Sequence, residues 1–397
     1  MVACKVHVEP VAAGERLRIA AVADFDGPHA RSWLRWFIDR GHDVHAVSFY
    51  PPATAVEGAT MHALRPERRQ SSRGASATDG VGRRVPRGLM RLAHALRYQR
   101  AGLARAVARI APDVLHGHFI VEHGFYAATL GRHPYVVTAW GSDVLVEPGR
   151  DPVSRRIARW TLRRADLATS NNRYMAQRMV ALGADPDRTH VITLGADTYF
   201  LEDGERSVNA RPAEPGRVPC VISTRAHEPL YNVDEIIDAY GRALRAGVQA
   251  RLVVLHGGAQ TAALRAQAEM AGGNIEFGGY QPREAFRAAL HDAEVFVSVP
   301  SSDGTSVALL QAMAAGCFPV VSDLATQREL VEDGVNGFRV PPHRPDLLGE
   351  RIAEALRDER LRRAAVERNR EIVRERGLNE REMAKMEALY REVAGRA

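Results

Sequence analysis

The sequence predicts an α/β protein with two doubly wound parallel sheets. At 397 residues the chain is long enough for two domains with separate hydrophobic cores. Short apolar runs alternate with amphipathic segments along most of the chain, which is the order of parallel strands joined by helices. A polar, proline-bearing run, LEDGERSVNARPAEPGRVP, interrupts this alternation. We therefore expect an N-terminal domain over 1–200, a linker over 201–219, a C-terminal domain over 220–375, and a last helix over 376–397 that could cross back to the N-terminal domain.

The N-terminal domain begins with a strand, a helix and a second strand. The helical spacing of Trp33, Trp36 and Phe37 directs all three side chains towards the core. Gly, Ser and Arg dominate the segment 65–87, which we interpret as a mobile loop. The expected strands are 17–23, 42–50, 113–119, 135–140, 166–171 and 190–197, and the expected helices are 29–40, 88–110, 122–131, 152–164 and 174–183.

The C-terminal domain repeats this alternation. Its expected strands are 220–225, 250–258, 274–280, 294–300, 318–323 and 336–342. Its expected helices are 232–247, 261–273, 282–293, one that starts at 306, and a short one at 326–334. The tail from 346 is nearly all helical, and Met383, Met386 and Leu389 share one face of its last helix.

The composition excludes several classes of protein. The formal net charge of +6 comes from arginine, since Lys5 and Lys385 are the only lysines, and the excess is spread along the chain without the aromatic-bearing basic stripe of a nucleic-acid binder. We therefore expect no nucleic-acid partner and at most peripheral contact with a membrane. Cys4, Cys220 and Cys317 are too far apart in the chain to signal disulfides or a zinc site. Without a membrane-spanning apolar run or a signal-peptide pattern, we expect a cytoplasmic protein; the composition carries no signal for an oligomeric state.

Small polar residues follow the buried strand 294–300 and lead into a helix. In an open parallel sheet, ligands bind beyond the carboxyl ends of the strands, where helix N-termini offer N–H groups to anions. Gly304 permits close approach of the backbone, and Thr305 and Ser306 add hydroxyl groups, so this run predicts a phosphate site. The alternative is that Asp303 or Thr305 only caps the helix and binds no ligand.

Two further strand ends point to the same edge of the sheet. Arg225 ends the strand 220–225, where its guanidinium could bind a diphosphate through two hydrogen bonds. The alternative for Arg225 is a surface ion pair with Glu228. Gly257 and Gly258 end another strand and leave backbone groups open. We expect these strand ends to converge on one anion site.

Polar residues also end two strands of the N-terminal domain. His116 and His118 end one strand, and the run Trp-Gly-Ser-Asp at 140–143 follows the next, but neither has the partner spacing of a metal site. Asp24 and Asp26 could form a carboxylate clamp for a metal, although a solvated turn is the favoured interpretation. The absence of G-x-G-x-x-G after the first strand and of G-x-x-x-x-G-K-[ST] anywhere argues against dinucleotide-binding dehydrogenases and phosphate-loop nucleotidases.

Seven segments occur in a specific order and spacing: HARSWLRWFIDRGHDVHAVSF, VLHGHF, VVTAWGSD, STRAHEPLYNVDEIIDAY, NIEFGGYQPREAF, SSDGTSVALLQAMAAGCFPVVSD and ELVEDGVNGFRVPP. With this order, the chain resembles the retaining glycosyltransferases of family GT4, or group 1, over nearly its whole length. The resemblance implies the GT-B fold, in which two Rossmann-like domains face each other across a cleft. The N-terminal domain would bind the acceptor and the C-terminal domain a nucleotide-sugar donor.

The resemblance also implies roles in donor binding. Where the family has two Glu residues separated by seven others, this chain has Asp303 for the sugar hydroxyls and Gln311 for the ribose. Arg225 matches the diphosphate-binding arginine, and Tyr231 stands in place of the lysine that shares this role, so His227 becomes a further candidate. The implied catalytic residues are His118, Arg225 and Asp303. The implied donor-binding residues are Gly304, Thr305, Ser306, Gln311, Gly257, Gly258, Gly279, Tyr280, Tyr231 and His227, with the base held by backbone near 279–281.

Further residues are implied on the acceptor side. His118 matches the family histidine near the reacting sugar, and Trp140 stands where many members have a second histidine. The implied acceptor-side residues are Gly27, His29, Trp140, Gly141 and Asp143.

The implied reaction is transfer of a glycosyl group from a nucleotide diphosphate sugar to an acceptor hydroxyl, with retention at the anomeric carbon. No cofactor and no essential metal are implied, because fixed dipoles and arginine would stabilise the departing diphosphate. UDP and GDP are the leading donor nucleotides, and natural-product, lipid and polysaccharide acceptors all stay open. Two other functions stay open as well: a GT-B epimerase or hydrolase that cleaves its donor, and a non-catalytic nucleotide-sugar-binding subunit, which Gln311 and Tyr231 motivate.

Overall fold

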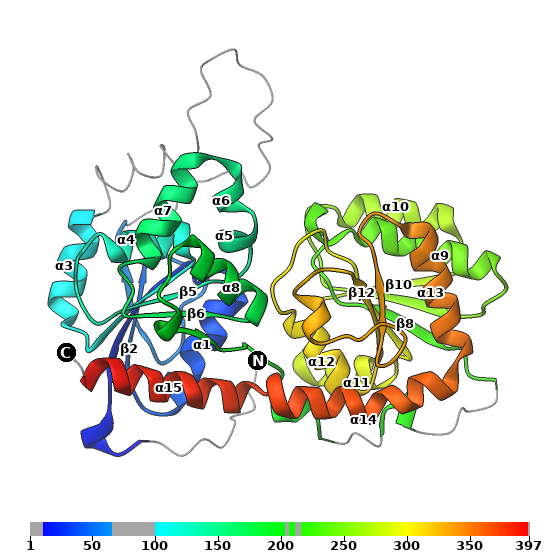
Figure 1. The fold of residues 1–397 in the computed structure, drawn as a ribbon. Coiled ribbons are helices and arrows are strands. Elements are labelled where there is room, and N and C mark those ends of the chain that lie inside the picture. The colour runs from blue at the N-terminus through cyan, green and yellow to red at the C-terminus, as the bar shows by residue number, and fades with distance from the viewer. Residues whose placement is uncertain (1–10, 66–99, 203–205, 211–215, 396–397) are drawn as a thin grey trace, which may run out of the picture. The chain divides into compact units, whose positions relative to one another are not determined.

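The computed structural model of the protein describes residues 11–65, 100–202, 206–210 and 216–395 (Figure 1). These residues form two compact units. The N-terminal unit comprises the chain up to Ile192 together with the segment from Met383 onward, and the C-terminal unit comprises Thr193–Glu382. Cys4, most of the expected loop 65–87 and the first part of the expected helix 88–110 lie outside the described residues.

The N-terminal unit contains a seven-stranded parallel sheet with the strand order β3-β2-β1-β4-β5-β6-β7. Its strands are β1 (Arg18–Val22), β2 (Asp43–Ser48), β3 (Thr60–Ala63), β4 (Val114–His118), β5 (Tyr135–Thr138), β6 (Leu167–Ser170) and β7 (Thr189–Val191). Strand β3 was not predicted, because the side chains of this edge strand are exposed or half-buried and show no apolar alternation.

The helices of the N-terminal unit are α1 (Pro28–Asp39), α3 (Arg100–Ile110), α4 (Phe125–Ala128), α5 (Ser142–Leu145), α6 (Glu147–Arg150), α7 (Pro152–Leu162), α8 (Arg173–Leu182) and α15 (Asn379–Gly395), most of which belongs to this unit. The expected helix 122–131 is instead a π-helical turn, Ile120–Gly124, followed by the short α4. The prediction for α1 was wrong at Trp36, which is only half-buried, whereas Trp33 and Phe37 are fully buried.

The C-terminal unit contains a six-stranded parallel sheet with the strand order β10-β9-β8-β11-β12-β13. Its strands are β8 (Cys220–Ser223), β9 (Arg251–Leu255), β10 (Asn274–Gly279), β11 (Val295–Ser298), β12 (Phe318–Ser322) and β13 (Phe338–Val340). Its helices are α9 (Val233–Arg245), α10 (Thr261–Ala271), α11 (Arg283–His291), α12 (Val307–Ala315), α13 (Pro345–Arg357) and α14 (Glu359–Arg376). The expected helix 326–334 is only a 3-10 turn, Gln327–Glu329.

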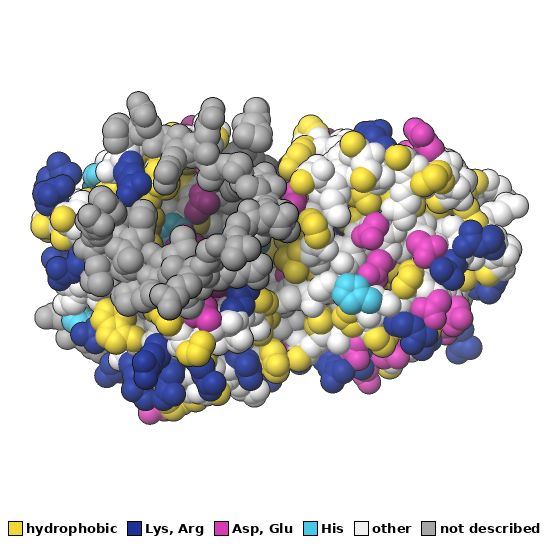
Figure 2. Space-filling view, turned by 90° about the horizontal axis from the view of Figure 1, so that it is seen from above, with side chains coloured by type: hydrophobic (Ala, Val, Ile, Leu, Met, Phe, Trp, Pro, Cys, Tyr) yellow, Lys and Arg dark blue, Asp and Glu magenta, His cyan; other side chains and the backbone are white. Residues whose placement is uncertain are grey.

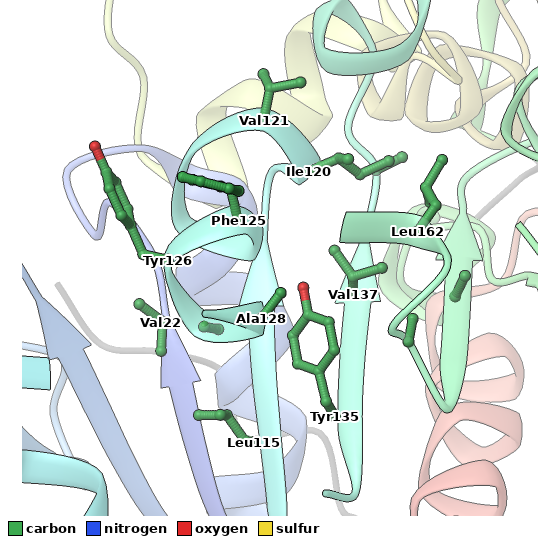
Figure 3. Close-up of a cluster of buried hydrophobic side chains, with 14 of the residues drawn as sticks. Val22, Leu115, Ile120, Val121, Phe125, Tyr126, Ala128, Tyr135, Val137 and Leu162 are labelled. Carbon is green, nitrogen blue, oxygen red and sulfur yellow. The ribbon is translucent and has the colours of Figure 1, made fainter. Parts of the chain in front are cut away.

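Both faces of each sheet are buried. In the C-terminal unit, Val221 and its neighbour Ile222 on β8 enter two separate hydrophobic clusters, one beneath α9 and α13 and the other beneath α11 and α12. Figure 3 shows one cluster of the N-terminal unit, in which Leu115 and Val137 of the sheet lie beneath Phe125. Such two-sided burial explains why the strands read as continuous apolar runs in the sequence.

The expected linker 201–219 does not behave as a free connection where it is described. Ser207 and Asn209 are buried, and the Asn209 side-chain amide donates to the carbonyl oxygens of Glu294 at 2.8 Å and Gly316 at 3.0 Å. This segment therefore packs onto the C-terminal unit. The run was interpreted as a linker because it is polar, but its buried polar side chains form hydrogen bonds with buried carbonyl groups and not with water.

The last helix, α15, completes the N-terminal core. Tyr390 is fully buried, its ring stacks on Phe37 at 4.9 Å, and its hydroxyl accepts a hydrogen bond from Trp33 Nε1 at 3.3 Å. Met383 and Met386 are buried as expected, but Leu389 is half-buried and Tyr390 takes the core position. Leu389 and Tyr390 are adjacent at the edge of the buried face, and helical periodicity alone could not show which of the two is buried.

Candidate functional site

The C-terminal sheet reverses its strand order between β8 and β11. In doubly wound sheets, ligands bind at this switch point, beyond the carboxyl ends of the strands. Arg225 follows β8 and the run 301–306 follows β11, so the two segments singled out in the sequence lie at the same switch point.

Arg225 is held by three side chains at this point. Its guanidinium donates from Nη1 to Ser306 Oγ at 2.7 Å, and its Nη2 lies 3.0 Å from Asp303 Oδ2. The ring of Tyr231 lies 4.2 Å from the Arg225 Cζ, in a cation–π contact. Arg225 is only 9% exposed, so its charge is fixed in direction rather than solvated. The alternative of an ion pair between Arg225 and Glu228 was wrong, because the Glu228 carboxylate instead accepts a hydrogen bond from the Ala259 amide at 3.2 Å.

The start of α12 is capped by Ser306. Its hydroxyl accepts a hydrogen bond from the Leu309 amide at 3.3 Å, so the suggested caps Asp303 and Thr305 were both wrong. Asp303 Oδ2 has no aligned hydrogen-bond donor, because the nearby Arg225 Nη2 makes an ion pair without hydrogen-bond geometry. The carboxylate of Asp303 therefore keeps unused acceptor capacity beside the guanidinium.

The other residues of this run have different exposures. Gly304 and Thr305 are buried, and Gln311 lies half-buried one turn further along α12. Thr326, which was not among the predicted site residues, donates from its hydroxyl to the Asp303 carbonyl at 3.0 Å and fixes the loop. The side-chain amide of Asn232 donates to the Val299 carbonyl at 2.8 Å and anchors the end of β11.

The glycine pair after β9 connects two loops. The Gly258 amide donates to Thr261 Oγ1 at 3.0 Å, so the expectation of open backbone was wrong for this amide. A Cβ atom on Gly258 would lie 2.6 Å from the His227 carbonyl oxygen, which explains the need for glycine. His227 donates its own amide to the Gly257 carbonyl at 3.2 Å.

His227 is a buried histidine with one ring nitrogen in use. Its Nδ1 lies 2.8 Å from Thr261 Oγ1, whereas its Nε2 has no hydrogen-bond partner. Burial lowers the pKa of His227, so its imidazole is neutral near pH 7. The structure therefore gives no support for His227 as a cation that meets diphosphate charge.

An aromatic side chain stands at the end of β10. Tyr280 is 74% exposed, and its ring lies 4.2 Å from that of His256. Gly279 adopts a positive φ of 66°, and its carbonyl accepts the His256 amide at 2.7 Å. The strand end that was expected to hold a base thus carries an exposed aromatic surface.

In the N-terminal unit, His118 lies among aromatic rings at the end of β4. It stacks on Trp140 with 5.7 Å between ring centroids and meets Trp33 edge-on at 5.8 Å. Neither ring nitrogen has a hydrogen-bond partner, although His118 is only 2% exposed. Burial lowers its pKa to about 3, so the ring is neutral.

His116 serves the core instead. Its Nε2 lies 2.7 Å from Thr138 Oγ1, and its Nδ1 forms a short hydrogen bond with the Tyr390 hydroxyl. Burial holds its pKa well below the usual value, and the nearby His118 lowers it further. The contact with Tyr390 could not be expected from the sequence, because 274 positions separate the two residues.

Asp143 organises the loops around His118. Its two carboxylate oxygens accept hydrogen bonds from the amides of Ile120, Trp140 and Gly141 at 2.9–3.0 Å, and it is fully buried. Burial raises its pKa and these amides oppose that rise. The structure makes Asp143 a positioning residue, and the φ of 151° and ψ of −86° at Gly141 explain that glycine.

The other acceptor-side residues have simpler surroundings. His29 is exposed and stacks on Trp140 at 5.2 Å, and Gly27 precedes α1 in extended conformation. The Asp26 amide donates to the Asp24 carboxylate at 2.9 Å, as in an ordinary turn, and the Asp26 carboxylate accepts the amide of the distant Ala53 at 2.7 Å. Among the residues that the structure describes, no group of three or more His, Cys, Asp or Glu side chains is placed to hold a metal ion. Within the same described ranges, no helix is both long and apolar enough to cross a bilayer.

Comparison with known proteins gives matches over both units. Residues 206–372 match the family described as Glycosyl transferases group 1, and residues 27–195 match the Glycosyl transferase 4-like domain. The chain is 30% identical to the D-inositol 3-phosphate glycosyltransferase of Xylanimonas cellulosilytica over 66% of this chain and 69% of that protein.

Two other relatives are matched over shorter shares. WcaL of Salmonella typhimurium, whose name assigns it to colanic acid biosynthesis as a glycosyltransferase, is 30% identical over 64% of this chain. The phosphatidyl-myo-inositol mannosyltransferase of Mycobacterium tuberculosis is 31% identical over 33% of this chain. The matched part spans 65% of WcaL and 35% of the mannosyltransferase, less than two thirds of either.

Solved structures share the architecture. HepE of Anabaena, solved with UDP-glucose, gives a TM-score of 0.70 at 15% identity, with coverage of 96% of this chain and 99% of that one. Sucrose-phosphate synthase of Thermosynechococcus elongatus gives 0.72 at 16% identity, with the same coverage. With two Rossmann-like units, this fold and matches to both family models, the chain belongs to the group 1 (GT4) glycosyltransferases and has their GT-B fold.

Proposed function

We propose that the protein transfers a glycosyl group from a nucleotide diphosphate sugar to an acceptor hydroxyl, with retention of configuration. The observation that carries the proposal is the grouping of Arg225, Asp303 and Ser306 at the switch point of the C-terminal sheet. One buried cation, one carboxylate with unused acceptor capacity and one helix N-terminus suit a diphosphate bonded to a sugar.

In this proposal, Arg225 and the N-terminus of α12 bind the diphosphate and stabilise the negative charge that develops when it leaves. The bond between the anomeric carbon and the diphosphate oxygen breaks, and the acceptor oxygen forms its bond on the same face. The acceptor proton passes to the departing phosphate oxygen. Asp303 accepts hydrogen bonds from sugar hydroxyls, and the neutral ring of His118 accepts or donates one hydrogen bond on the acceptor side.

The donor nucleotide is proposed to be UDP or GDP. HepE was solved with UDP and with UDP-glucose, which supports UDP as the first candidate. The exposed ring of Tyr280 offers a flat surface for a base. A thermal-shift panel of UDP, GDP, ADP and dTDP would identify the preferred nucleotide, because a ligand that binds the folded state raises its melting temperature.

Arg225→Gln tests the diphosphate site. Loss of two charge-assisted hydrogen bonds should weaken binding of the preferred nucleotide about 100-fold, or about 3 kcal/mol, as measured by calorimetric titration. Arg242→Gln is the matched control, because Arg242 is an exposed arginine of the same unit paired with Asp238. Equal affinity of R225Q and R242Q for the nucleotide would remove the site from the proposal.

Asp303→Asn tests catalysis separately from nucleotide binding. The variant should bind the free nucleotide as the wild type does but lose turnover with the nucleotide-sugar, because its amide cannot replace the carboxylate at sugar hydroxyls. Labelled nucleotide-sugars distinguish transfer from epimerisation and from binding without turnover. Chelation with EDTA should leave the wild-type rate unchanged, since Arg225 and α12 are proposed to do the work of a metal; a loss restored by Mg²⁺ would contradict this.

A further inference from the structure

Helix α7 of the N-terminal unit has an unusual exposed face. Its buried positions, Ser154, Ile157, Ala158, Thr161 and Leu162, form one stripe against the core. The exposed positions from 155 to the end of the helix are Arg155, Arg156, Arg159 and Trp160, and the turn that follows adds Arg163 and Arg164. This face, which we call the arginine face, carries no acidic side chain.

The arginine face is not neutralised within the protein. Over the described part of the chain, none of its five arginines forms an ion pair with an acidic side chain. The two neighbouring carboxylates have other partners: Asp151 accepts the amides that open α7, and Asp166 accepts from Tyr135 and His133. Arg155, Arg159 and Arg163 follow one another at four-residue spacing, an arrangement in which like charges destabilise a helix. A bound anionic partner would relieve this repulsion.

Apolar side chains accompany the charges. Trp160 is 36% exposed, packs edge-on against Phe125 at 5.5 Å, and lies 4.3 Å below the Arg164 guanidinium. On the adjoining helix α8, which carries two more arginines and no acidic residue, Tyr174 and Val180 are exposed. Figure 2 shows that Lys and Arg side chains gather along one rim of the N-terminal unit, with hydrophobic side chains among them.

The arginine face also forms a shallow hollow of about 470 Å³, lined by Arg156, Arg159, Trp160, Arg163 and Arg164. Four guanidinium groups around one tryptophan match the chemistry of a phosphate-bearing lipid surface, where cations meet headgroups and an aromatic ring lies at the interface. A nucleic acid would match the charge equally well. However, single strands are bound on successive aromatic rings, and the arginine face has one.

We propose that the arginine face of α7, with the adjoining exposed side chains of α8, docks the protein on an anionic lipid surface. The helix lies on the headgroups, with its arginines on lipid phosphates and Trp160 at the boundary with the acyl chains. Docking of this kind is peripheral and reversible, and it requires neither a spanning helix nor catalysis.

Co-sedimentation of the full chain with vesicles tests the proposal. The wild type should bind vesicles of equal parts phosphatidylcholine and phosphatidylglycerol and not vesicles of phosphatidylcholine alone, and added salt should release it. The variant R155Q/R159Q/R163Q should bind about 100-fold more weakly, at about fivefold for each arginine. The control R360Q/R363Q/R374Q removes the same charge from exposed positions of α14 and should bind as the wild type does.

A second readout reports on Trp160. Brominated lipids in the anionic vesicles should quench wild-type tryptophan fluorescence, and Trp160→Phe should remove most of that quenching while binding persists. Three results would each overturn the proposal. The first is equal weakening of vesicle binding in both triple variants, and the second is wild-type binding by R155Q/R159Q/R163Q with an unchanged melting temperature. The third is unchanged fluorescence quenching in W160F. Tighter binding of a single-stranded oligonucleotide than of the vesicles, lost in R155Q/R159Q/R163Q, would also overturn it and assign the face to nucleic acid.

Discussion

Replacing Glu387 by Gln should destabilise the N-terminal unit at neutral pH, and the effect should become smaller as the pH falls below the unfolded-state pKa of this carboxyl group. Glu387 lies on α15 and is 6% exposed at its side chain. It accepts hydrogen bonds from Arg40 Nε at 3.0 Å, Trp36 Nε1 at 3.1 Å and Arg391 Nη2 at 2.9 Å. The contacts with Trp36 and with Arg40, which caps the end of α1, attach the last helix to α1, whereas Arg391 lies on α15 itself.

The magnitude follows from the pKa of Glu387. Burial of the carboxylate by itself raises its pKa, but the hydrogen bonds from Arg40, Arg391 and Trp36 together outweigh burial and lower the pKa from 4.5 to about 2. A shift of this size corresponds to about 3 kcal/mol by linkage. The two arginines are 24% and 33% exposed at their side chains, so solvent screening reduces the expected contribution to about 1–2 kcal/mol.

The sign of the pH dependence is fixed by this lowered pKa. The stabilisation by Glu387 is fully present above the unfolded-state pKa of 4.5 and is lost as the pH falls through the folded-state value of about 2. Urea unfolding at several pH values between 7 and 3 should therefore show E387Q less stable than the wild type by about 1–2 kcal/mol at pH 7, with a smaller difference at pH 3. Glu392→Gln, at an exposed position of the same helix, is the control. A difference between E387Q and the wild type that stays constant over this range would refute the reasoning.

Two further substitutions test the loops around the proposed site. Asp143→Ala should lower the free energy of unfolding by about 3 kcal/mol, because two buried amides and one partly buried amide lose their acceptor. Urea unfolding measures this, and a loss below about 1 kcal/mol would mean that the amides find other acceptors. Gly258→Ala should displace the loop that carries His227, since the new Cβ atom would lie 2.6 Å from the His227 carbonyl oxygen. This displacement should weaken nucleotide binding about tenfold, as measured by calorimetry. Gly257→Ala, whose Cβ would lie no closer than 3.4 Å to its nearest neighbour, the Tyr280 ring, should have a smaller effect; equal effects would contradict this explanation.

The alternation of strands and helices could be predicted from the sequence because it depends on local periodicity. The strand run at β11 and the helix α12 were placed correctly, and so was the convergence of Arg225 on the 301–306 run, since carboxyl ends of parallel strands share one edge. The identity of the cap was not predictable in the same way. Asp303, Thr305 and Ser306 are all residue types that cap helices, and only the backbone geometry selects Ser306.

Contacts between distant parts of the chain were beyond the sequence. Nothing in the local pattern around His116 indicates a tyrosine hydroxyl as its partner, and nothing around Asp143 indicates that its carboxylate accepts the amide of Ile120, 23 positions away. The polar segment 201–219 shows a further limit of local patterns. The whole run was interpreted as a linker from its polarity, whereas Asn209 within it satisfies buried carbonyl groups that a local pattern cannot show.

The place of Tyr390 in the N-terminal core has a consequence for biosynthesis. The ribosome makes β1 to β7 first, but the tyrosine that covers Trp33 and Phe37 is encoded after the whole C-terminal unit. Part of the apolar surface of the nascent N-terminal unit therefore stays uncovered while the whole C-terminal unit is synthesised. A premature stop codon before Tyr390 would thus leave the half of the protein that was translated first unfinished.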